Sequence, residues 1–99
     1  MYNRTKEWIH FSDQVDRHII HYTLPQYGNT EGDEQIDTFT TDQIKSQLQR
    51  YVTRIGSSVR GTQEQLRDCL KIAHYAQFLY NKLQLLTGQE DLYKDEDQA

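Results

Sequence analysis

Arginines near the end of one predicted helix and the start of the next are the residues best suited to chemistry. Arg50 and Arg54 are four residues apart and therefore share one face of a helix. Arg60 follows in a short turn before a helix that starts at Thr62, where free backbone amides favour an anion. Guanidinium groups match the oxygens of a phosphate, so this spacing suits a phosphate ligand. On spacing alone, solvated or ion-paired arginines are the simpler interpretation.

A second face of the following helix carries Arg67, Lys71, His74 and Phe78 at positions i, i+4, i+7 and i+11. A lysine and a histidine that face one groove would suit a ligand. His74 lies in the most apolar part of the chain, however, and the sequence favours a histidine that hydrogen-bonds within a core.

The histidines and the cysteine do not form the sequence pattern of a metal site or of a catalytic nucleophile. His18 and His21 share a helical face, but no HExxH motif accompanies them. Cys69 is the single cysteine, and its place among apolar residues predicts burial and low reactivity. We therefore predict no metal site, no cofactor and no enzymatic reaction.

The first helix that must position these groups runs to about Tyr22. It begins either at Ser12, as an N-cap, or upstream near Thr5. Pro25 ends it because proline lacks an amide donor. The rings of Tyr22 and Tyr27 beside this break would suit stacking on a nucleobase. A plain helix stop, with the tyrosines packed on the rest of the fold, is an equally good interpretation.

Two further helices are predicted on either side of the arginine-bearing turn. One begins at Thr40 or Thr41 and ends before Gly56, and the other begins with Thr62 as N-cap and ends at Gly88. A glutamine at the capping-box position supports the Thr62 start. Because the connection is short, the two helices should form an antiparallel hairpin.

Each hairpin helix has an apolar stripe at helical spacing. The stripe of the first contains Ile44, Leu48, Tyr51, Val52 and Ile55. The stripe of the second contains Leu66, Cys69, Leu70, Ala73, Ala76, Tyr80 and Leu83. From residue 72 to residue 80 the second helix is apolar or aromatic almost all round, which predicts burial on more than one side.

Composition indicates a hydrophobic core that is small for the size of the chain. Only 35% of the 99 residues are hydrophobic and 26% are charged. We predict an all-α fold, with an N-terminal helix and an antiparallel helical hairpin completed by homo-oligomerisation. Residues 1–88 form the single domain, and residues 89–99 form a disordered acidic tail.

Charge and the N-terminal sequence limit partners and location. The net charge is −4, yet residues 41–88 hold seven basic and three acidic residues, so the hairpin is basic. The acidic remainder disfavours general nucleic-acid binding. No apolar run reaches the roughly 20 residues that span a bilayer. With one cysteine and no apolar leader in MYNRTKEW, we predict a cytoplasmic protein without a membrane anchor.

Three motifs in order resemble those of the small bacteriophage anti-CBASS proteins. They are Ile20-His21-Tyr22-Thr23-Leu24-Pro25, Ser58-Val59-Arg60 and Ala73-His74-Tyr75-Ala76. The resemblance covers about 60 residues, from 20 to 83. Ile20 stands where the family has an aromatic residue, and Tyr75 stands where it has tryptophan.

The resemblance implies a function, a site and an assembly. Members of that family bind cyclic oligonucleotide second messengers of bacterial defence systems without degrading them, as homo-oligomers, typically hexamers, with pockets between subunits. Tyr22 would stack on a base, Arg60 with Arg50 or Arg54 would neutralise phosphates, and Pro25 would shape the pocket wall. The ligand would be a cyclic di- or trinucleotide in the cytoplasm of the host cell. The alternative is a non-catalytic oligomeric module that binds another protein.

Overall fold

The computed structural model describes residues 2–23, 38–57 and 61–93. It contains the helix α1 (Asn3–His18), the π-helical turn η1 (Ile19–Thr23), and the helices α4 (Thr41–Arg54) and α5 (Thr62–Thr87). Every element within these ranges is helical, which confirms the all-α class. Completion of the fold by further copies of the chain stays a prediction.

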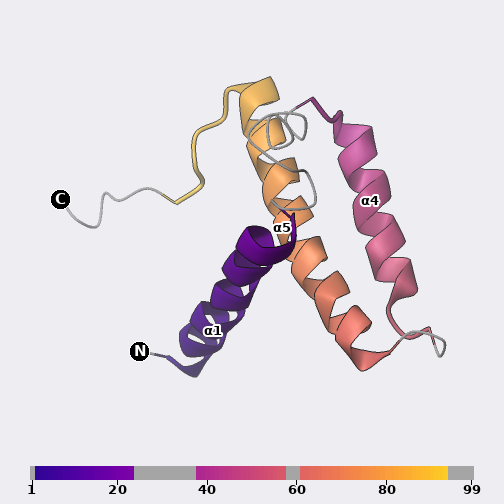
Figure 1. Cartoon of the computed structure of the whole chain (residues 1–99). Coiled ribbons are helices and arrows are strands. Elements are labelled where there is room, and N and C mark those ends of the chain that lie inside the picture. The colour runs from indigo at the N-terminus through magenta and orange to yellow at the C-terminus, as the bar shows by residue number, and fades with distance from the viewer. Residues whose placement is uncertain (1, 24–37, 58–60, 94–99) are drawn as a thin grey trace.

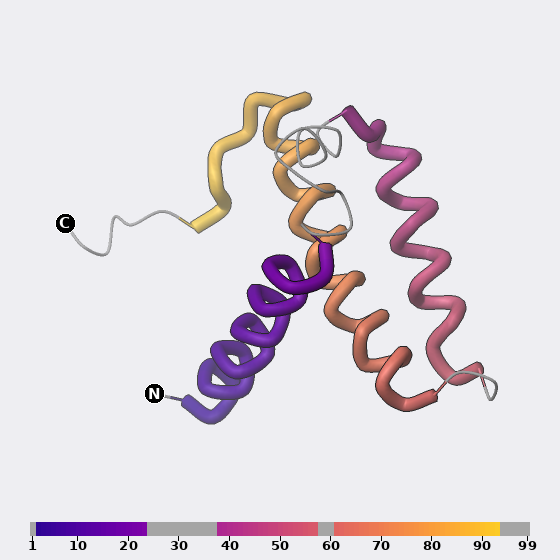
Figure 2. The backbone as a smooth tube through the Cα atoms, viewed as in Figure 1, coloured from indigo at the N-terminus to yellow at the C-terminus, as the bar shows by residue number. Residues whose placement is uncertain are grey.

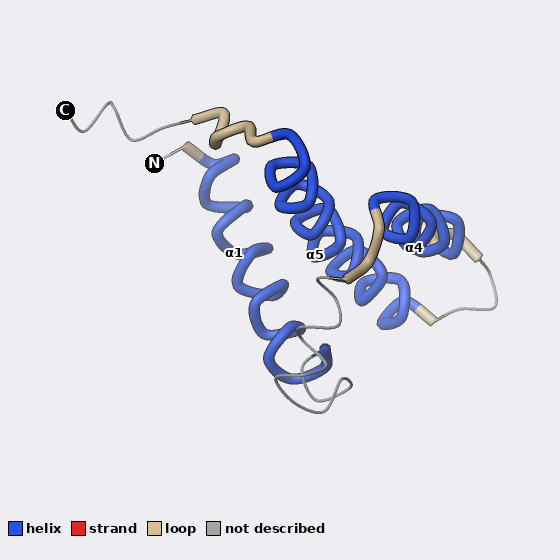
Figure 3. The backbone as a smooth tube through the Cα atoms, turned by 90° about the horizontal axis from the view of Figure 1, so that it is seen from above, coloured by secondary structure: helices blue, strands red, loops and turns tan. Residues whose placement is uncertain are grey.

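The longest helix, α5, lies between the other two (Figures 1 and 3). Helix α4 runs antiparallel to it and packs along it, which confirms the predicted hairpin (Figure 1). Helix α1 packs against α5 from the other side (Figure 3), with its C-terminal end near the middle of α5 (Figure 1). None of the described helices combines the length and the apolar composition that crossing a membrane requires.

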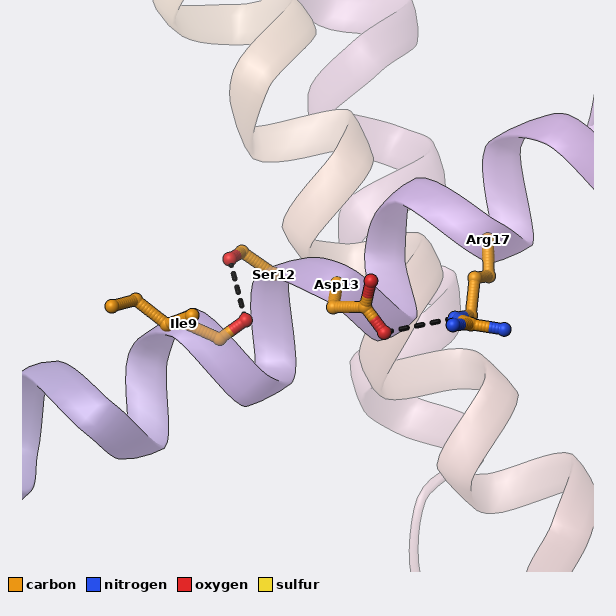
Figure 4. A network of polar contacts seen from close by, with 4 residues as sticks. All are labelled: Ile9, Ser12, Asp13 and Arg17. Atoms are coloured by element: carbon orange, nitrogen blue, oxygen red, sulfur yellow. Dashed lines mark hydrogen bonds and ion pairs between the residues drawn. The ribbon is translucent and has the colours of Figure 1, made fainter.

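The start of α1 settles an alternative that the sequence leaves open. The helix begins at Asn3, close to the predicted upstream start. Ser12 lies inside it, where its hydroxyl donates a 3.0 Å hydrogen bond to the carbonyl of Ile9, so Ser12 as N-cap is wrong. Arg17 and Asp13 form an exposed ion pair at 2.8 Å one turn further along (Figure 4).

The start of α4 follows the capping chemistry of its sequence. The Gln43 amide donates to the Thr40 hydroxyl at 3.1 Å, and the Thr40 amide donates to the Gln43 side chain at 2.8 Å. This reciprocal pair satisfies two donors that a helix start leaves open, and Thr40 is confirmed as the N-cap. Gly56 follows α4 with a φ of 90°, a conformation that favours glycine and confirms the predicted helix end.

The start of α5 differs from the prediction by one residue. Gly61 is the N-cap and makes no side-chain cap bond, whereas Thr62 is the first helical residue, so Thr62 as cap is wrong. The Gln65 side chain, predicted to close a capping box, instead accepts a 3.0 Å hydrogen bond from the Gly56 amide. This bond ties the end of α4 to the first turn of α5.

The core lies between α4 and α5. Its buried hydrophobic residues in the described ranges are Ile44, Tyr51 and Tyr75. Around them pack the partly buried Phe39, Leu48, Ile72, Phe78 and Leu79. The tyrosine rings meet across the hairpin with centroids 5.5 Å apart, and such aromatic pairs are favourable at this spacing.

The predicted apolar stripe of α5 does not face α4. All seven of its members, Leu70 included, are exposed or half-buried. We call the other six the outer stripe: Leu66, Cys69, Ala73, Ala76, Tyr80 and Leu83. Helix α4 instead packs on the neighbouring row that contains Ile72, Tyr75 and Leu79. In the outer stripe Leu66, Ala76, Tyr80 and Leu83 are exposed, and Cys69 and Ala73 are half-buried.

After α5 the chain turns back along the helix end (Figure 2). Gly88, with a φ of 70°, ends the helix as predicted. Asp91 then accepts hydrogen bonds of 2.8 Å from the Tyr80 hydroxyl and from the Gln84 side chain. The predicted acidic tail is described only to residue 93, and residues 94–99 lie outside the described part.

Replacing Ile44 with alanine tests the position of the core. The side chain is 2% exposed, so Ile44→Ala should lower the free energy of unfolding by about 2–5 kcal/mol, through lost burial and a cavity. Val52→Ala is the matched control on the same helix, because Val52 is 56% exposed and should change stability little. Urea unfolding followed by circular dichroism measures both. Equal losses in the two variants would contradict this core.

Candidate functional site

A pocket of about 120 Å³ lies where the end of α1 meets both hairpin helices. We call it the junction pocket. Its lining residues come from η1 and the last residue of α1, from α4 and from α5: His18, Tyr22, Thr23, Arg50, Tyr51, Lys71 and Tyr75. The pocket therefore depends on the docking of α1 as well as on the hairpin.

The π-helical turn carries the tyrosine of the site. Tyr22 belongs to η1, one turn beyond His18 at the end of α1. The two rings are stacked, with centroids 5.0 Å apart and an angle of 17° between their planes. His18 is 8% exposed, whereas Tyr22 is 43% exposed and keeps part of its surface open. Single π-helical turns of this kind often occur at functional sites.

Cationic side chains gather on the rings of the pocket. The Arg67 guanidinium carbon lies 5.8 Å from the centroid of the Tyr22 ring, and the Lys71 ammonium nitrogen lies 5.5 Å from it. The same lysine nitrogen is 5.4 Å from the centroid of the Tyr51 ring. Lys71 therefore sits between a tyrosine of η1 and a tyrosine of α4. Cation–π attraction favours this placement.

The two arginines predicted from spacing also meet the Tyr51 ring. The guanidinium carbons of Arg50 and Arg54 each lie 5.7 Å from its centroid. Arg50 lines the pocket and Arg54 does not. Their shared helical face thus supplies positive charge to the α4 side of the site, as the spacing of four predicts.

Acidic groups near these cations stand outside the pocket lining. Glu64 forms an ion pair with Arg67, one turn along α5. Asp68 is fully buried in the same stretch of the helix. The residues that line the pocket in the described part of the chain include no carboxylate. The described part of the lining is therefore mainly basic and aromatic.

The surroundings of His18 favour its neutral form. Burial lowers the pKa of the imidazole, and the nearby charges of Lys71 and Arg67 lower it further. His18 is therefore mainly uncharged at pH 7. One ring nitrogen can then donate a hydrogen bond while the other accepts one.

The structure places only some of the predicted site residues. Tyr22 and Arg50 line the junction pocket, and Arg54 lies on the neighbouring Tyr51 ring. Pro25, Tyr27 and Arg60 lie outside the described residues. Among residues 2–23, 38–57 and 61–93, no three metal-binding side chains come together in a group that could hold an ion.

Sequence reasoning missed His18 and the two core tyrosines as site residues, and it named Lys71 only as the less favoured interpretation of its helical face. The helical spacing of Arg67 and Lys71 did signal a second basic face, and that face meets Tyr22. His74 on the same face is buried, with its ring 4.2 Å from that of Phe78. Its burial agrees with the core interpretation. The spacing of four between His18 and Tyr22 was the available signal for the stacked pair.

Comparisons with protein-family models, with curated proteins and with solved structures find no match to this chain. The resemblance to anti-CBASS proteins therefore remains a prediction from the three motifs.

The lowered pKa of His18 predicts a pH dependence of stability. Because the imidazole binds a proton more readily in the unfolded chain, the folded state loses stability as the pH falls below about 6.5. His18→Gln should therefore lose less stability than the wild type between pH 8.0 and pH 5.5, measured by urea unfolding. His10→Gln is the control, because His10 is exposed on the same helix. A His18→Gln loss as large as that of the wild type would contradict the assignment.

Proposed function

We propose that this protein is a phage anti-defence protein that binds cyclic oligonucleotide second messengers and sequesters them without degrading them. The observation that carries the proposal is the junction pocket, where an accessible tyrosine ring stands beside converging cations. A ligand with bases and phosphodiester groups matches this pairing, because bases stack on aromatic rings and phosphates bind guanidinium and ammonium groups. The three sequence motifs support the same function.

Charge favours a small anion over a nucleic-acid polymer. The chain has a net charge of −4, whereas the pocket gathers Arg50 and Lys71 with Arg54 and Arg67 close by. A polymer would need positive charge along an extended surface. The cations gathered at this pocket suit a compact ligand with few phosphates, such as a cyclic di- or trinucleotide.

The residue types favour binding over catalysis. The described lining offers a hydroxyl at Thr23 and a neutral imidazole at His18, but no carboxylate to orient that imidazole as a general base. The ligand is then held by stacking and charge, and it leaves chemically unchanged.

The outer stripe supports the homo-oligomer that the proposal includes. Ligand pockets usually enclose about 300–1,000 Å³, more than the 120 Å³ of the junction pocket. A second subunit would supply the missing walls. The small residues Cys69, Ala73 and Ala76 at the centre of the outer stripe let another helix approach closely. Their 3- and 4-residue spacing is that of helix–helix seams, and a hexamer is the assembly that the family resemblance suggests.

Exposed apolar side chains favour a second candidate, an oligomeric module that binds another protein. Trp8 is 61% exposed and Ile9 is 52% exposed on α1, while Leu85 is 77% exposed near the end of α5. Such side chains suit a protein interface. In that case the cations of the pocket would serve the interface, and cyclic nucleotides would leave the melting temperature unchanged.

Thermal melting with a panel of cyclic di- and trinucleotides tests the first candidate. A ligand at 100 times its Kd stabilises by about 2.7 kcal/mol, which for a chain of this size raises Tm by roughly 10 °C or more. Tyr22→Ala should abolish the rise and Tyr22→Phe should keep it, because stacking needs only the ring. Tyr93→Ala is the control, since Tyr93 is 92% exposed near the other end of the chain.

Chromatography of the heat-released ligand checks that it is recovered intact. No rise in Tm with any member of the panel would overturn the proposal, and a cleaved product would overturn its non-enzymatic part.

A charge in the outer stripe tests the assembly. Ala76→Glu should convert the oligomer to monomers in sedimentation equilibrium, because it buries an unpaired carboxylate between helices. Gln77→Glu, at the adjacent exposed position outside the stripe, should leave the mass unchanged. A monomeric wild type would contradict the oligomer.

A further inference from the structure

We propose that the junction pocket itself holds one phosphate oxyanion of the ligand, with the base outside it, and that His18 takes up a proton as the anion enters. The inference deepens the proposed function and rests on it for the identity of the natural ligand. The anion-binding chemistry rests on the pocket alone.

A phosphate group with its four oxygens fits the volume of about 120 Å³ in the junction pocket. Tyr22 is 43% exposed, and the open part of its ring offers a surface outside the pocket on which the base can stack.

Donors reach the pocket from all three helical segments. Lys71 of α5 stands between two tyrosine rings, at 5.5 Å from one and 5.4 Å from the other, and its ammonium carries three donors. Arg50 brings a guanidinium fork from α4, and Thr23 brings a hydroxyl from η1. An oxyanion among these groups would accept hydrogen bonds on several sides, two of them charge-assisted.

The groups around His18 explain why its protonation is linked to the anion. Tyr22 stacks on it from η1, Lys71 and Arg67 act on it from α5, and Arg50 lines the same pocket from α4. Of the nearby acids on α5, Glu64 pairs with Arg67 and Asp68 is fully buried.

Burial and the charges of Lys71 and Arg67 hold the pKa of His18 below its usual value. A bound anion offsets that positive field and favours the imidazolium, which adds another charge-assisted donor. By linkage, a lower pH must then strengthen anion binding.

Sulfate is the probe that isolates this linkage, because it stays a dianion between pH 5.5 and pH 8.0. We expect sulfate to bind roughly tenfold more tightly at pH 5.5, the effect of about one added charge-assisted hydrogen bond. Titration is followed by the NMR signals of the His18 ring, with sodium chloride at equal ionic strength as the control. Dimethyl phosphate tests the phosphodiester group, and adenosine tests a base and sugar without phosphate.

Variants separate the pocket from general effects of pH. His18→Gln should still bind sulfate but with little dependence on pH, and His10→Gln should behave as the wild type. Lys71→Met should weaken the binding of sulfate at both pH 5.5 and pH 8.0. If His18→Gln does not fold, the titration of the wild type is sufficient as a test. The inference requires that sulfate raise the pKa of His18, which is read from the NMR signals of its ring.

The inference would be overturned if the affinity for sulfate did not change with pH. It would also be overturned if adenosine raised the pKa of His18 as sulfate does. A flat response to cyclic oligonucleotides would overturn the proposed function and leave the sulfate result standing.

Discussion

The contact between Tyr51 and Tyr75 is the interaction on which the rest of this structure depends. It joins α4 to α5 with ring centroids 5.5 Å apart, and the same two rings form part of the junction pocket. The core and the site thus share residues, which is a consequence of small size: few buried side chains exist that serve packing alone. A tyrosine suits both duties because its ring is apolar while its hydroxyl and its π-face accept polar neighbours.

Four cationic side chains lie close together beside this core and repel one another. Contacts with tyrosine rings and with one carboxylate offset part of that repulsion. Arg50, Arg54, Arg67 and Lys71 each lie against a tyrosine ring, and Glu64 compensates Arg67. These contacts position the charges before a ligand arrives, so less ordering remains to oppose binding. The proposed anion would relieve the remaining repulsion between the cations. The same positive field that disfavours a charged His18 is the one that would attract this anion.

The elements of the fold were predictable where local backbone chemistry decides them. Thr40, Gly56 and Gly88 mark helix ends through capping or positive φ, and each was predicted from sequence. The site was not predictable in full, because it forms where α1 docks on α5, and that docking depends on contacts distant in sequence. Tyr22 and Arg50 were predicted, but Lys71 was assigned to a separate face, and helical spacing could not show that this face meets Tyr22.

The five-residue turn η1 has a consequence for how the chain tolerates change. An α-helix advances by about 100° per residue, so removing one of the three residues between His18 and Tyr22 would rotate α1 by about that angle relative to Tyr22. His18 would leave the Tyr22 ring, and another side of α1 would turn toward α5. The length of this turn therefore sets which residue of α1 meets Tyr22.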